Sequence, residues 1–190
     1  MTRILARFSI LNFCGLLAAF VVGLVSKLTG APGDPHSPLP TYHFYLGLFS
    51  VLGTLAVHCL IFIYFLGTGR WVKEVAIAYG IPDRPLPKLT RELKRRTFPV
   101  ALAAMLVSIA AAATGAGAGV ALGEGRWPWP YHALLAAATL LVNAWAFVVE
   151  YRNVGINAGI IDDVMREVDR IRAERGLPTN EEALREQESV

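Results

Sequence analysis

The stretch from His43 to Leu66, HFYLGLFSVLGTLAVHCLIFIYFL, contains no Lys, Arg, Asp or Glu. A helix needs roughly 20 mainly apolar residues to cross the hydrocarbon of a bilayer, at a rise of ~1.5 Å per residue. The stretch is therefore predicted to be a membrane-spanning helix.

Three further stretches have a similar length and composition, and they run from Ile4 to Leu28, from Pro99 to Leu122 and from Tyr131 to Tyr151. The first is longer than the apolar part of a typical signal peptide, and no A-x-A-like cleavage site follows it, so we expect a retained helix. The sequence thus predicts an all-α membrane protein, a four-transmembrane-helix bundle formed by residues 1–155.

The two remaining segments are polar but patterned. In residues 67–98 an apolar face precedes Pro82 and predicts a short helix lying in the membrane interface, formed by Trp71, Val72, Val75, Ala76 and Tyr79. In residues 156–190, apolar side chains recur every three or four residues, at Ile161, Val164, Val168 and Ile171. This spacing predicts a C-terminal cytoplasmic helix that packs on the 67–98 loop or on another chain.

The cations predict the orientation, because Lys and Arg are retained on the cytoplasmic side of a membrane. They precede the first span, fill the 67–98 loop and recur in the tail, whereas the opposite side has only Lys27 and Arg126. We therefore expect a multi-pass protein of a bacterial-type inner membrane with both termini in the cytoplasm. The net charge of +3 is explained by this topology, and no nucleic-acid partner is predicted.

Each predicted span carries polar side chains at similar depth. Asn12, His58, Ser108 and Asn143 all fall roughly 10 to 14 Å from the cytoplasmic side. Glu150 shares one helical face with His132, Thr139 and Asn143. Two interpretations remain open: these groups form hydrogen bonds that hold the helices together, or His58, Asn143 and Glu150 form a proton or ion path.

A Pro-Tyr-His pattern opens the second and the fourth spans, as Pro40-Thr41-Tyr42-His43 and Pro130-Tyr131-His132. His43 and His132 are expected at one depth, because these two helices run in the same direction. Two imidazoles suit a b-type haem; with His36 from the preceding loop, three suit a zinc or copper ion. The alternative is an ordinary interfacial belt of Tyr, Trp and His.

His58 has no equally deep histidine on another span, so a haem there would need a ligand from a second subunit. The repeated Pro-Tyr-His opening also hints at two duplicated hairpins, although the rest of the two halves do not align convincingly.

The sequence lacks a nucleotide motif, a metal-spaced cysteine set and any sizeable soluble domain. We therefore expect an accessory or anchoring subunit of a larger membrane complex, with no catalytic activity of its own. Its partners would be the lipid bilayer and other membrane subunits or further copies of the chain. Two alternatives are a redox anchor that binds haem b or a metal ion, or contacts quinone, and a proton or ion path.

Overall fold

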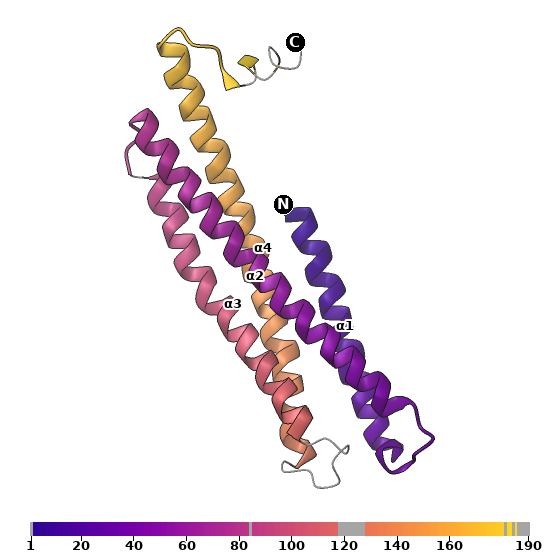
Figure 1. Cartoon of the computed structure of the whole chain (residues 1–190). Helices are drawn as coiled ribbons and strands as arrows, with labels where there is room; N and C mark the ends of the chain where they lie inside the picture. Colours follow the sequence, from indigo (N-terminus) through magenta and orange to yellow (C-terminus); the bar gives the residue numbers. More distant parts are fainter. Residues whose placement is uncertain (1, 84, 118–127, 181, 184, 186–190) are drawn as a thin grey trace. The chain divides into compact units, whose positions relative to one another are not determined.

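Four long helices make up most of the computed structural model, which describes residues 2–83, 85–117, 128–180, 182, 183 and 185. They are α1 (Thr2–Leu28), α2 (Leu39–Tyr79), α3 (Leu86–Gly117) and α4 (Trp129–Glu174) (Figure 1). A single 3₁₀ turn, η1 (Ala31–Gly33), follows α1. All four helices are long and apolar enough to cross a membrane. The predicted all-α fold with four helices long and apolar enough to span a membrane is confirmed within the described residues.

The chain forms two compact units. The first contains residues 1–62 and 97–152, and the second contains residues 63–96 and 153–190. The first therefore includes α1 with parts of α2, α3 and α4, and the second contains the remaining parts of the last three helices.

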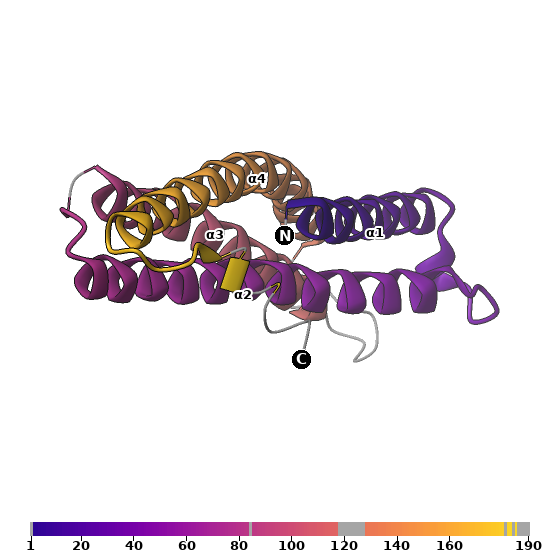
Figure 2. The same cartoon turned by 90° about the horizontal axis from the view of Figure 1, so that it is seen from above.

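The first unit is built from two antiparallel hairpins. In one, α1 packs on α2, with Asn12 bonded to Thr54 and Ala19 bonded to His43. In the other, α3 packs on α4, with Ser108 bonded to Asn143 and Ala111 bonded to His132. Figures 1 and 2 both show α1 alongside the N-terminal part of α2.

The two hairpins meet along α2 and α4, which run parallel in this unit. His43 of α2 lies against His132 of α4, and His58 farther along α2 bonds to Asn143 farther along α4. Phe62 of α2 also contacts Phe98 of α3 edge to face, with ring centroids 4.5 Å apart. α2 and α4 are thus the central pair of this bundle.

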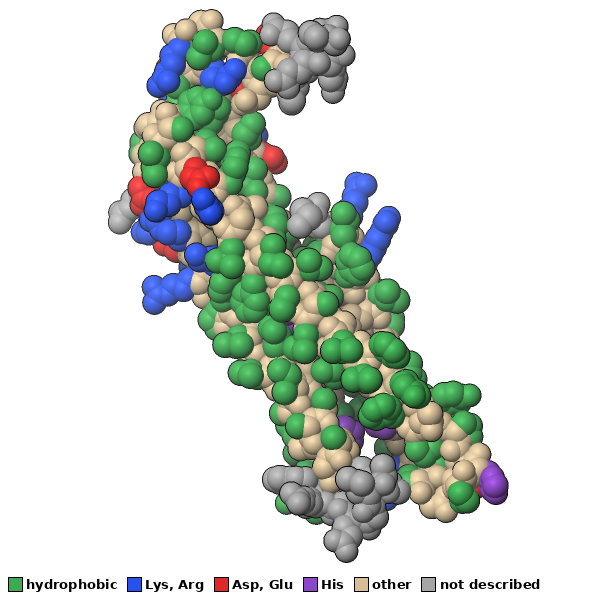
Figure 3. All heavy atoms as spheres, viewed as in Figure 1, with side chains coloured by type: hydrophobic (Ala, Val, Ile, Leu, Met, Phe, Trp, Pro, Cys, Tyr) green, Lys and Arg blue, Asp and Glu red, His purple; other side chains and the backbone are tan. Residues whose placement is uncertain are grey.

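Polarity in the first unit is opposite to that of a water-soluble domain. Large apolar side chains point outward, and Leu11, Phe49 and Leu141 are each about two-thirds or more exposed (Figure 3). The buried polar side chains include Thr54, His58, Ser108, Thr139, Asn143 and Glu150. Apolar surface of this extent marks a membrane or partner interaction site on a soluble protein, and here it fits burial in lipid.

The second unit is a three-helix arrangement with an apolar core. Its core side chains come from all three helical segments and include Phe65, Val72, Leu93, Val154, Val164 and Val168. Asn157 of α4 donates to the Tyr64 and Thr68 hydroxyls of α2, each at 3.1 Å. The predicted apolar seam of the tail contributes to this core through Val164 and Val168, while Ile161 and Ile171 are half-buried.

The prediction of a separate short interfacial helix is wrong. Its residues form the last part of α2, which continues unbroken through Gly67 and Gly69 and ends only before Gly80. Glycine disfavours helix by about 1 kcal/mol, and packing of a buried face overrides such a preference. Gly80, at φ 71°, adopts the left-handed conformation that commonly ends a helix.

The C-terminal helix is likewise a continuation of α4 to Glu174. The predicted third span, 99–122, corresponds to a helix that begins earlier, at Leu86, and is described as far as Gly117. Arg126, Trp127 and the end of this span at Leu122 lie outside the described residues.

Candidate functional site

Two groups of polar side chains in the first unit contain the predicted site residues. One is the histidine pair, His43 of α2 and His132 of α4. The other is the polar chain, which links Glu150, His58, Asn143 and Ser108.

The imidazoles of the histidine pair lie 5.8 Å apart between ring centroids, with their planes at 70°. Both side chains are half-buried, and Figure 3 shows histidine side chains in a recess of the apolar surface. The expected shared depth of His43 and His132 therefore corresponds to a direct contact between their rings.

One ring nitrogen of each histidine is held by a backbone carbonyl of the preceding helix. His43 Nδ1 lies 2.9 Å from the Ala19 oxygen, and His132 Nδ1 lies 3.0 Å from the Ala111 oxygen. A carbonyl oxygen only accepts, so Nδ1–H is the donor in both bonds. In each neutral ring, Nε2 then carries the lone pair, which is the arrangement found in histidines that ligate metals.

Each ring packs closely against a glycine of that preceding helix. A Cβ placed on Gly23 would lie 2.5 Å from His43 Cε1, and one on Gly115 would lie 2.8 Å from His132 Cε1. Each glycine follows the carbonyl-bearing alanine by four residues, as Ala19 to Gly23 and Ala111 to Gly115. The two hairpins thus hold their histidines by the same two contacts.

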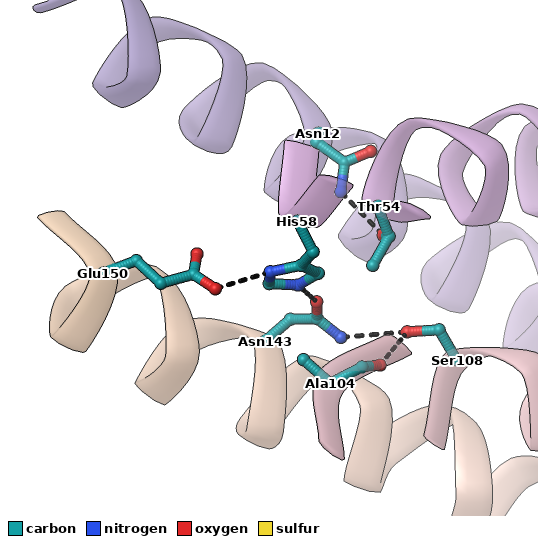
Figure 4. Close-up of polar contacts among 7 residues, drawn as sticks. All are labelled: Asn12, Thr54, His58, Ala104, Ser108, Asn143 and Glu150. Carbon is teal, nitrogen blue, oxygen red and sulfur yellow. Dashed lines mark hydrogen bonds and ion pairs between the residues drawn. The ribbon is translucent and has the colours of Figure 1, made fainter. Parts of the chain in front are cut away.

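The polar chain begins at a buried carboxyl group. Glu150 Oε1 lies 2.7 Å from His58 Nδ1, and the two side chains are 1% and 0% exposed (Figure 4). On its other side, His58 Nε2 lies 3.0 Å from Asn143 Oδ1. Asn143 Nδ2 donates to Ser108 Oγ at 3.1 Å, and Ser108 donates to the Ala104 carbonyl at 2.8 Å.

His58 differs from the histidine pair because both of its ring nitrogens are already bonded, one to Glu150 and one to Asn143. One ring face stacks on Phe147, with centroids 5.3 Å apart. A metal bond at either nitrogen would displace one of these hydrogen bonds. His58 thus has no ring nitrogen free for a metal, whereas His43 and His132 each have one, Nε2, that makes no hydrogen bond within the described residues.

Asn12 was predicted at the same depth, but it lies outside the polar chain. Its Nδ2 donates to Thr54 Oγ1 at 2.8 Å (Figure 4). Thr54 donates onward to the Ser50 carbonyl. A Cβ on Gly53 would lie 2.4 Å from Asn12 Oδ1, so α1 and α2 approach closely here. Asn12 therefore joins the helices of one hairpin.

His36 lies in the exposed loop before α2, where its backbone N–H donates to the Asp34 carboxylate. Among the residues that the structure describes, no three His, Cys, Asp or Glu side chains are grouped so that they could hold a metal ion. His36 therefore does not join His43 and His132 in a three-ligand site.

Sequence reasoning did not identify the residues that hold the histidine pair on the preceding helices. The available signal was the Ala-x-x-x-Gly spacing, which occurs as Ala19 to Gly23 and again as Ala111 to Gly115. Comparison of the chain with protein-family models, curated proteins and solved structures finds no match.

Proposed function

We propose that the protein is a membrane anchor subunit of a redox complex and that His43 and His132 are the two ligands of a haem b. Their rings are in contact in this structure, so binding of the porphyrin would move them apart. The observation that carries the proposal is the contact between these two imidazoles, each fixed through Nδ1 to a carbonyl and seated on a glycine. Two parallel helices of a bundle that each present one imidazole inward are a recurrent way to build a cofactor site.

Haem fits this pair better than a single metal ion because of the number of ligands. A porphyrin supplies four nitrogens to its iron, so two imidazoles complete the coordination. Zinc in proteins takes three or four protein ligands, and the described part of the chain offers no group of three. When bound, the haem would supply one-electron transfer; the chain's own residues would orient the two imidazoles and surround the group with apolar side chains.

The expected placement in the cell supports an anchoring role. Lys and Arg are concentrated in the segments 67–98 and 152–185, which favours a cytoplasmic location for both termini in a bacterial-type inner membrane. The second unit then provides a helical surface outside the hydrocarbon on which a partner subunit can dock.

A reduced-minus-oxidised visible spectrum of the protein, extracted in mild detergent from its native membrane, tests the proposal. We expect a b-type band that is lost in His43→Ala and in His132→Ala. His36→Ala is the matched control, because His36 is exposed and outside the pair, and it should keep the band. A colourless and metal-free protein that is properly folded would reject the redox function and leave copurifying partners as the route to its role.

A further inference from the structure

The polar chain has a fixed direction of hydrogen bonding. Ser108 Oγ donates its proton to the Ala104 carbonyl, so its lone pair accepts from Asn143 Nδ2. Asn143 Nδ2 also donates to the Thr139 carbonyl at 2.9 Å, which uses its second N–H. The remaining group of the amide, Oδ1, is an acceptor and faces His58.

This direction determines the tautomer of His58. Because Asn143 Oδ1 can only accept, His58 Nε2 must carry a proton and donate it. The 2.7 Å contact between His58 Nδ1 and Glu150 Oε1 then contains one further proton. That proton lies either on Nδ1, next to a carboxylate, or on Oε1, next to a neutral imidazole, and the pair has zero net charge in both forms.

The two ends of the polar chain differ in whether a proton can enter there. At the Ser108 end, the hydrogen bonds stop at the Ala104 carbonyl, which can accept a hydrogen bond but passes no proton onward. At the other end, Glu150 Oε2 is buried and accepts no hydrogen bond within the described residues. Oε2 is therefore the oxygen of the pair that is free to bind a further proton, and Arg152, two residues farther along α4, is exposed.

Among the residues that the structure describes, no charged side chain of the surrounding helices forms a hydrogen bond or ion pair with the His58–Glu150 pair. On α1, Arg3 and Arg7 are exposed, and the part of α3 in this unit, residues 97–117, has no ionisable side chain. On α2 the adjacent Cys59 is exposed, and on α4 Arg152 is exposed. Losing the shared proton would therefore leave a buried carboxylate beside an imidazole lone pair, without a compensating cation.

We propose that His58 and Glu150 form a proton-binding site that holds one proton, exchanges it through Glu150 Oε2 and is closed beyond Ser108. An incoming proton binds Oε2, and one of the two protons is then released to water, so the pair is neutral before and after the exchange. The site stores a proton on one side of the bundle and does not conduct protons across it. This role is independent of any group bound by the histidine pair.

Infrared spectroscopy of the full chain in lipid vesicles, transferred from H₂O to D₂O, tests the exchange. The protonated pair should give a deuterium-sensitive signal that is lost in Glu150→Gln, because the glutamine amide replaces the exchanging carboxyl. Glu74→Gln, at an exposed position in α2, is the matched control and should keep the signal. Ser108→Ala should leave the exchange rate within about twofold of the unmodified chain if the route beyond Ser108 is closed.

Nitrogen NMR of the unmodified protein labelled in histidine is a second readout that does not depend on a variant. We expect His58 Nε2 to carry a proton, because its partner Asn143 Oδ1 can only accept a hydrogen bond. An Nε2 without its proton, or a pair that exchanges no deuterium while its helix termini do, would overturn the binding site. A proton flux across the vesicle membrane that is abolished in His58→Ala would overturn its closure and make it a conduit.

Discussion

His58 and Phe147 stack face to face, with ring centroids 5.3 Å apart and planes at 19°. They occupy equivalent places in the two hairpins, since each follows the histidine of its own helix, His43 or His132, by 15 residues. The same offset of 89 residues relates His43 to His132 and Thr54 to Asn143. In the second unit, Asn157 donates to Thr68, again a pair separated by 89 residues.

The two hairpins thus share these spacings, but the helices before each histidine are shifted differently. Ala19 and Gly23 correspond to Ala111 and Gly115 at an offset of 92 residues, because the connection from glycine to histidine is three residues shorter in the second hairpin. A sequence comparison at one offset therefore aligns only half of each hairpin, and a duplication of the hairpins stays a prediction.

Alanine at Gly23 or Gly115 should displace the imidazole that each glycine seats. The added Cβ would lie 2.5 Å from the His43 ring or 2.8 Å from the His132 ring, far inside contact distance. We expect loss of the Nδ1 hydrogen bond, a lower melting temperature in detergent and weaker binding of any haem. Gly47→Ala is the control, because a Cβ there meets nothing within 4 Å. Equal melting temperatures and equal haem binding in the three variants would contradict the packing of the imidazoles on Gly23 and Gly115.

Removal of the Glu150 carboxyl should destabilise the bundle strongly. Breaking a buried pair by deleting one partner typically costs about 3–5 kcal/mol, so Glu150→Ala should lower the free energy of unfolding by an amount of this order. Glu150→Gln should cost less, because its amide N–H can donate to His58 Nδ1 as a protonated carboxyl would. Equilibrium unfolding in mixed micelles measures both, and an equal loss in the two variants would contradict the assigned hydrogen bonding.

Gly67→Ala should stabilise the protein by about 0.4–1 kcal/mol, since the position is helical and a Cβ there meets nothing within 4 Å. The gain arises because alanine has fewer backbone states to lose on folding than glycine. A break in the helix at this position, as a separate interfacial helix would require, would make the same substitution neutral or unfavourable. The unfolding midpoint of the variant therefore separates a continuous α2 from a broken one.

Alanine at Asn157 should destabilise the second unit. The side chain is fully buried and donates to the hydroxyls of Tyr64 and Thr68, so its removal leaves both hydroxyls without this donor. A buried polar group that loses its partner costs about 1–3 kcal/mol. Amide hydrogen exchange along residues 63–79 and 153–174 should rise in the variant, and unchanged protection would show that these bonds contribute nothing.

In the tail, Arg170 donates two hydrogen bonds to the Glu167 carboxylate and holds the pKa of Glu167 below its ordinary value. The stabilisation from this pair is present above the ordinary pKa of a glutamate and is lost as the pH falls through the lowered pKa. Because the pair is exposed, its effect on stability is small. Carbon NMR titration should show the Glu167 pKa rising in Arg170→Gln, and an unchanged value would contradict the pairing.

Helical periodicity predicted the polar faces but not the neighbours of those faces. It placed Asn143 and Glu150 on one side of their helix, and this is the side that contacts His58. Periodicity fixes the angle of a side chain around its own helix, whereas the order of helices around a bundle depends on packing. For that reason Asn12, at the same predicted depth, bonds to Thr54 and is not part of the polar chain.

The two hairpins carry different residues at the equivalent places that form the buried acid–base pair. Two separate copies of one hairpin would carry the same residue at each equivalent place, so both would have histidine at position 58 or both phenylalanine. A single chain that contains both hairpins is free of this restriction, and it has His58 opposite Phe147 and Ile61 where the other half has Glu150. Linkage of the two hairpins in one chain thus permits one acid and one base to meet at places that two identical hairpins would fill with the same residue.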